Sequence, residues 1–109
     1  MFDYTATITK VIDGDSIDLI VDLGFHISVA IRTRLLGIDA PETSTPEGKV
    51  ARDRLRAELP VGTAVTIHTE KDPGDKYGRW LAKIDGPMGD VADWMIAQGM
   101  AKAYFGGAR

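Results

Sequence analysis

Acidic side chains gather at two separate places in the first half of the chain. Asp13 and Asp15 flank one glycine, and Asp39 and Glu42 stand further along. Oxygen ligands without neighbouring histidine or cysteine suit hard cations such as calcium or magnesium. The chain has no cysteine and two distant histidines, which argues against disulfides, thiolate catalysis and a zinc site. From spacing alone, a plain turn with solvated acids explains these residues as well as a cation site does.

A second candidate group is basic. Arg34 lies at the end of one predicted strand, and Arg79 opens another. The planar guanidinium binds phosphate oxygens through paired hydrogen bonds, so two arginines beside a cation would suit a charged phosphorus centre. The simpler interpretation is that each arginine makes a surface ion pair. Tyr77 and Tyr104 are candidates for contact with a phosphate or a base, although tyrosines at such places more often only pack.

Apolar spacing predicts the element order β-β-β-α-β-β-α. Strands are expected over 4–12, 16–23, 26–36, 63–71 and 80–84, and helices over 47–59 and 91–98. Thr45 is the expected N-cap of the first helix, with Pro46 at its first position. The residues expected to face inward on the second and third strands are Ile17, Leu19, Val21, Leu23, Ile27, Val29, Ile31 and Leu35. Five strands favour an α+β, mainly β fold, a Greek-key barrel of the OB type.

The predicted strands bring the two acidic pairs together. Adjacent antiparallel strands place the start of one beside the end of the next, so Asp13 and Asp15 should meet Asp39 and Glu42. Asp15 shares its parity with the inward residue Ile17 and should point toward the barrel interior. Burial of a carboxylate there is costly without a cation.

Length and composition indicate one globular domain. The chain has 109 residues, of which 44% are hydrophobic and 27% charged, and we expect one domain over 1–109 with an ordered core from about 3 to 105. The net charge of −3 disfavours nucleic-acid binding by charge alone. No apolar run reaches transmembrane length, and no signal peptide is evident, so the sequence favours the cytoplasm without deciding the compartment and predicts no membrane partner.

Three motifs in order resemble those of the staphylococcal nuclease (thermonuclease) family. They read VIDGDS at 11–16, RLLGIDAPET at 34–43 and DKYGR at 75–79, with a weaker match QGMAK at 98–102. The second motif is highly specific, and the resemblance covers about residues 4–105. It implies an OB-fold, one calcium ion and hydrolysis of phosphodiester bonds in DNA and RNA.

The resemblance also implies a role for each matching residue. Asp15 and Asp39 would be carboxylate ligands of calcium, the backbone carbonyl of Ala40 a third ligand, and Asp13 an outer-shell residue. The implied catalytic residues are Arg34 and Arg79 at the scissile phosphate and Glu42 beside the attacking water. The implied substrate-binding residues are Lys76, Tyr77 and Tyr104.

One departure from the family pattern is that the chain stops soon after Phe105, where the family's usual C-terminal helix would follow. We therefore expect a short form that is either less stable or a homo-oligomer that covers the bared surface. The main alternative function is a nucleic-acid-binding OB module without turnover. A partner-binding OB domain is a third interpretation, although neither alternative requires this set of acids and arginines.

Overall fold

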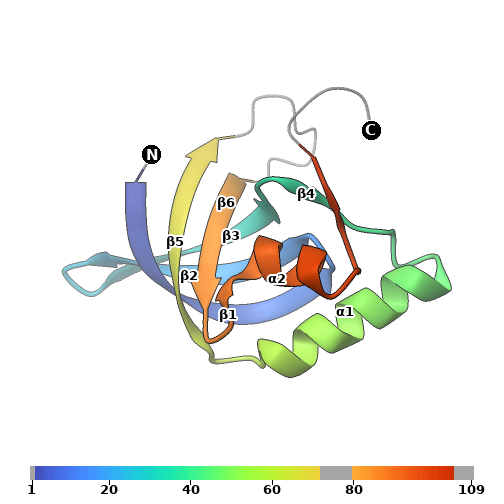
Figure 1. Ribbon diagram of the computed structural model, residues 1–109. Coiled ribbons are helices and arrows are strands. Elements are labelled where there is room, and N and C mark those ends of the chain that lie inside the picture. The colour runs from blue at the N-terminus through green and yellow to red at the C-terminus, as the bar shows by residue number, and fades with distance from the viewer. Residues whose placement is uncertain (1, 72–79, 105–109) are drawn as a thin grey trace.

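The computed structural model describes residues 2–71 and 80–104 (Figure 1). The elements are β1 (Phe2–Asp13), β2 (Ser16–Gly24), β3 (Ile27–Leu35), β4 (Ile38–Asp39), α1 (Pro46–Glu58), β5 (Ala64–Lys71), β6 (Trp80–Gly86), β7 (Gly89–Asp90), α2 (Val91–Ala97) and β8 (Lys102–Ala103). Within these described ranges, no helix is long and apolar enough to cross a membrane.

Five strands close into a barrel. Antiparallel neighbours follow the order β3-β2-β1-β5-β6, and β3 then pairs in parallel with β6 to join the two ends. The closing contact is short and runs from Thr33 to Leu35 on β3. This architecture confirms the predicted mainly β OB-type barrel with two helices.

The barrel interior is filled by aliphatic side chains from every long strand. Its fully buried members include Ile8, Ile17, Leu19, Leu35, Ile67 and Ile84. Helix α1 runs along the lower edge of the barrel in Figure 1 and buries Ala51 and Leu55 against it. Thr45 caps this helix by accepting a hydrogen bond from the Gly48 amide at 3.1 Å, as predicted. Burial of each large aliphatic side chain contributes about 1.5–3 kcal/mol to folding.

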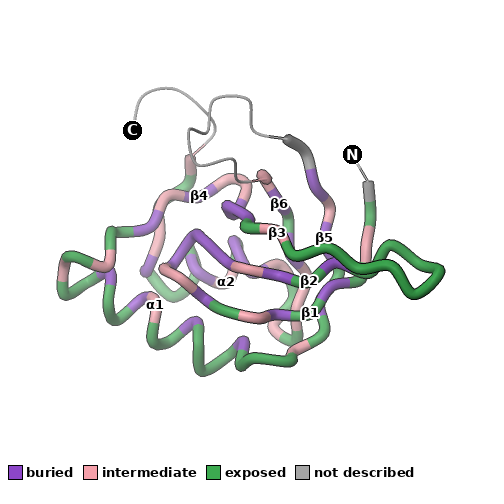
Figure 2. The backbone as a smooth tube through the Cα atoms, turned by 180° about the vertical axis from the view of Figure 1, so that it is seen from behind, coloured by how far each residue is buried: buried purple, intermediate pink, exposed green. Residues whose placement is uncertain are grey.

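The hairpin of β2 and β3 extends beyond the barrel, and this differs from the prediction. Leu23, Ile27 and Val29 were expected to face inward but are 45%, 57% and 42% exposed. Apolar and polar side chains do alternate along the two strands, but β3 pairs with β6 only from Thr33 onward. Leu23 and Val29 of this part of the hairpin line an open apolar hollow with Tyr4, Ile67 and Trp80 and are not covered by a paired strand. Figure 2 shows this part as a protruding, exposed segment.

The tip of this hairpin is a tight two-residue turn. Phe25 and His26 both have positive φ, 55° and 62°, and Gly24 pairs with Ile27 across the turn. The prediction placed His26 at the start of a strand, but it lies in the turn. Residues other than glycine and asparagine are unusual at such positions because the left-handed conformation crowds the Cβ atom.

The short pairing of β4 with β8 was not predicted. Ile38 and Asp39 of β4 pair with Ala103 and Lys102 of β8, within a segment expected to be loop. The Tyr104 amide extends this contact by donating to the Gly37 carbonyl at 2.8 Å. Strands of two residues have no periodicity to detect, and their partners are distant in sequence.

A charged cluster on the outer face of the barrel links β1, β5 and β6. His68 contacts Asp3 through Nδ1 and Asp85 through Nε2, the latter at 3.3 Å, while Lys83 lies beside Asp85. The hydrogen bond to the Asp3 carboxylate is the largest influence and raises the pKa of His68, with a smaller contribution from Asp85. The folded protein therefore holds the His68 proton more tightly than the unfolded chain does.

This cluster predicts a pH-dependent contribution to stability. Because the pKa of His68 is raised in the folded protein, the stabilisation is fully present below its unfolded pKa of ~6.5. It is lost as pH rises through the folded pKa of His68. Asp3→Asn should lower the thermal midpoint at mildly acidic pH and leave it unchanged in alkaline buffer. The control is Asp53→Asn, whose partner is an arginine and not a histidine. A decrease in the thermal midpoint of Asp3→Asn that is equal at both pH values would contradict this account.

Candidate active site

The turn between β1 and β2 directs Asp15 into the end of the barrel. Asp15 is 7% exposed, and its carboxylate oxygens accept from the Ala40 amide at 3.0 Å and from the Ser16 hydroxyl at 3.4 Å. The Asp15 carbonyl also accepts from the Leu35 amide at 2.8 Å. The inward position predicted from parity is confirmed. The residue ties the β1–β2 turn to the chain that follows β3.

Arg34 lies between the two acidic groups. It is 5% exposed, and its Nη2 atom lies 4.0 Å from Asp15 Oδ2 and 3.8 Å from Asp39 Oδ1. The same nitrogen donates to the Ile38 carbonyl at 3.3 Å, and the guanidinium carbon lies 5.6 Å from the centre of the Tyr104 ring. Of the four acids predicted to meet, Asp15 and Asp39 come together here, with a shared guanidinium between them.

Asp13 adds further negative charge to this end of the barrel. Its carboxylate accepts from the Asp15 amide at 3.1 Å. Burial, together with the neighbouring Asp15 carboxylate, raises the pKa of Asp13 to about 6. Glu42, the fourth acid, is exposed on the loop that leads to α1, where its backbone carbonyl accepts from the Thr45 amide at 3.0 Å.

The donor chemistry of this site suits a hard cation that keeps part of its water shell. Among the residues that the structure describes, no three Asp, Glu or His side chains converge as a metal-holding group. Two carboxylates, Asp15 and Asp39, nevertheless share one guanidinium. Asp13 contacts Asp15, and its raised pKa reflects burial and the nearby Asp15 charge. Carboxylate and carbonyl oxygens supplemented by water are the ligands that calcium and magnesium take. The residues present therefore fit such an ion.

Two glycines permit the close approach of the segments that carry these acids. A Cβ atom on Gly14 would lie 2.8 Å from Ala40 Cβ, and one on Gly48 would lie 1.8 Å from the Glu42 carbonyl oxygen. Sequence reasoning treated Gly14 as a turn residue and gave Gly48 no role. The signal that could have revealed Gly48 is a poor helix former in the first turn of a predicted helix.

Three predicted site residues, Arg79, Lys76 and Tyr77, lie outside the described residues. The predicted substrate residue Tyr104 is described, and its ring lies over the Arg34 guanidinium. The structure thus brings together Asp13, Asp15, Arg34, Asp39 and Ala40, and leaves Glu42 on the adjoining loop.

Comparison with known proteins agrees with this geometry. The family model described as "Staphylococcal nuclease homologue" matches residues 32–108, which is most of the chain. The chain belongs to the staphylococcal nuclease family. This membership confirms the resemblance drawn from the three motifs.

Individual relatives share most of this chain but extend beyond it. "Micrococcal nuclease" of Shigella flexneri is 35% identical over 94% of this chain and 59% of its own length. An "Uncharacterized endonuclease" of Escherichia coli O157:H7 is 29% identical over 94% of this chain and 62% of its own length. "Protein ParB" of Escherichia coli is 36% identical over 89% of this chain and 55% of its own length. The chain therefore spans less than two thirds of the length of these relatives.

Because of the tight contact at Gly48, an alanine substitution there should destabilise the protein, although the same change usually stabilises a helix. Alanine for glycine within a helix normally stabilises by about 1 kcal/mol. Gly48→Ala should instead destabilise by about 1–3 kcal/mol, because the new methyl group must displace the Glu42 backbone. Urea unfolding measures the change.

Gly86→Ala is the matched control for this measurement. Its Cβ would meet side-chain atoms of Leu59 and Met88 at 3.2 Å and of Val65 at 3.6 Å, and side chains adjust more readily than backbone, so it should be tolerated better. A Gly48→Ala protein at least as stable as the wild type would contradict the close contact.

Proposed function

We propose that the chain is a calcium-dependent nuclease that hydrolyses phosphodiester bonds of DNA or RNA. The observation that carries the proposal is a buried guanidinium, Arg34, held between the Asp15 and Asp39 carboxylates at the end of an OB-type barrel. Arginine beside a cation site is suited to binding a phosphate and the charge that builds on it. The names of the Shigella flexneri and Escherichia coli relatives, micrococcal nuclease and endonuclease, support the same activity.

Calcium, when bound, would neutralise phosphate charge and polarise the phosphorus centre. Asp15 and Asp39 would hold the ion through carboxylate oxygens and Ala40 through its backbone carbonyl, with Asp13 in the outer shell. The Ala40 amide donates to Asp15 at 3.0 Å, which supports this assignment because it holds the Asp15 carboxylate beside the Ala40 backbone.

Arg34 would contact the scissile phosphate from the protein side. Its guanidinium is already oriented by the Ile38 carbonyl and the Tyr104 ring, so little reorganisation is needed when charge develops. Burial strengthens its interaction with a phosphate because water screens it less. Arg79, which the sequence motif alone supports, would take a second phosphate oxygen.

Glu42 would orient the attacking water. Its exposed position on the loop before α1 leaves it accessible to water and substrate. A glutamate is a weak base at neutral pH, so orientation of the water is the better-supported role. Lys76, Tyr77 and Tyr104 would contact the substrate away from the bond that breaks.

The alternative of a binding module without turnover has less support. Binding by phosphate neutralisation requires a surplus of lysine and arginine, whereas this chain has a net charge of −3. The arginine at the site is buried among carboxylates and is not presented on an exposed basic surface. This arrangement favours a local phosphate contact at one bond over a long electrostatic track.

Cleavage of a fluorescent single-stranded DNA and a matching RNA tests the proposal. Arg34→Lys retains the charge but loses the planar fork. It should reduce the cleavage rate in calcium by about 10²-fold or more, which is the typical cost of losing one transition-state donor. Arg79→Lys and Glu42→Gln should also lose activity, and chelator should abolish it in the wild type.

Arg54→Lys is the matched control, since Arg54 is an exposed arginine of α1 that donates to Gln98. It should retain the wild-type rate. Cleavage by a folded Arg34→Lys protein at the rate of the Arg54→Lys control would remove Arg34 from the mechanism. Binding of either nucleic acid without any cleavage would favour the binding module.

A further inference from the structure

The protruding hairpin carries an unpaired strand edge. β3 pairs with β2 along its length, but with β6 only at Thr33, Arg34 and Leu35. In the part of the chain that the structure describes, no strand pairs with the outer side of residues 27–32. Alternate backbone N–H and C=O groups of a strand point away from its one partner. This edge, residues 27–32 of β3, therefore offers a row of hydrogen-bonding groups.

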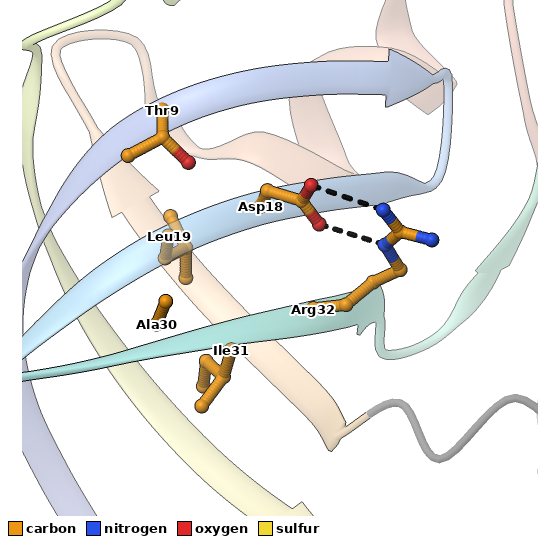
Figure 3. Close-up of a pocket in the computed structure, with 6 residues that line it drawn as sticks. All are labelled: Thr9, Asp18, Leu19, Ala30, Ile31 and Arg32. Carbon is orange, nitrogen blue, oxygen red and sulfur yellow. Dashed lines mark hydrogen bonds and ion pairs between the residues drawn. The ribbon is translucent and has the colours of Figure 1, made fainter.

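The edge also lacks the devices that usually protect an unpaired strand. Residues 27–31 include no charged residue and no proline, and Ile27 and Val29 are largely exposed. The one charged side chain, Arg32, turns back to Asp18 of its own hairpin and makes two hydrogen bonds of 2.8 and 3.2 Å (Figure 3). An exposed apolar edge without such protection is a template for pairing with another strand.

We propose that this edge pairs antiparallel with the same edge of a second copy, in a symmetric dimer centred on Ala30. A two-fold axis at Ala30 places Ser28 opposite the partner's Arg32 and Val29 opposite the partner's Ile31. The contact then uses residues 28–32, which stop just short of the pairing with β6 at Thr33. Both copies satisfy their outward backbone groups in one continuous sheet.

Charge on the two copies is complementary in this register. Within one hairpin, Ser28 pairs with Asp22 and Arg32 pairs with Asp18. Across the dimer, Arg32 therefore lies opposite the small side chain of the partner's Ser28, with the partner's Asp22 on the next strand. Each arginine pairs with its own Asp18, and the partner's Asp22 is a more distant carboxylate on the same face. On the opposite face, Val29 and Ile31 meet the partner's Ile31 and the partner's Val29, which extends an apolar row.

Other occupants fit this edge less well. The protruding part of the hairpin, residues 18–32, carries two carboxylates, Asp18 and Asp22, against one arginine, Arg32, so it does not attract a polyanion such as a nucleic acid. A lipid surface would accept the tip residue Phe25, which is 96% exposed, but would leave the backbone edge unsatisfied. A second copy satisfies the hydrogen bonds, the apolar row and the charges together.

Sedimentation velocity across micromolar to submillimolar protein tests the proposal. The wild type should sediment as a dimer of the 11.8 kDa chain at the upper concentrations. Ala30→Lys and Ala30→Glu each place like charges opposite one another at the axis, and each should be monomeric. Because Ala30 is exposed, both variants should fold, and circular dichroism checks that they do. Ala57→Lys, at an exposed alanine of α1, is the control and should remain dimeric.

An equimolar mixture of the two Ala30 variants gives the sharpest readout. Lysine then faces glutamate across the axis, and the mixture should recover the dimer that neither variant forms alone. A wild type that is monomeric at every concentration would overturn the proposal. So would a dimer that persists in Ala30→Lys, because its interface would lie elsewhere, for example at the surface near the end of the chain. A monomer that binds phosphatidylcholine vesicles through Phe25 would assign the hairpin to a lipid surface instead.

Discussion

One buried guanidinium contacts the buried Asp15 carboxylate and the half-exposed Asp39 carboxylate, and this contact constrains the closed end of the barrel. Asp15 and Arg34 are almost fully removed from water, and removal of either charge from water without a partner would cost several kcal/mol. The partners come from separate segments: the β1–β2 turn, the end of β3, β4 and the Ala40 backbone. The cluster therefore requires β3 to be held against β6 and β4 to be held by β8. Closure of the barrel and assembly of the site are the same event.

A contribution to folding stability does not explain this charged cluster well. Ion pairs in a protein interior often contribute less than well-packed aliphatic side chains of similar volume. Here Asp15 and Asp39 share a single arginine, and burial together with the neighbouring Asp15 carboxylate raises the pKa of Asp13. The proposed cation would offset this excess of negative charge. The exposed hairpin at the opposite end of β2 and β3 shares the same strands but none of this chemistry.

The parts of the fold that follow from local rules could be predicted from the sequence. Strand parity placed Asp15 inward, and antiparallel geometry brought it toward Asp39. Capping rules located the start of α1 at Thr45. The overhang of the hairpin could not be predicted, because alternation shows which residues share a face but not where the opposing sheet ends. Gly48 was missed because its role depends on how closely the Glu42 backbone approaches the first turn of α1, although a glycine at that helical position was a detectable signal.

The free energy of unfolding, measured in urea with calcium and with chelator, tests the central claim most directly. Calcium at about one hundred times its dissociation constant should stabilise the wild type by about 2.7 kcal/mol, because the ion binds only the folded site. Asp15→Asn should lose most of this gain, while Asp53→Asn, a carboxylate change on the exposed face of α1, should keep it. An equal calcium-dependent gain in Asp15→Asn and the wild type would contradict the assignment of this cluster as the cation site.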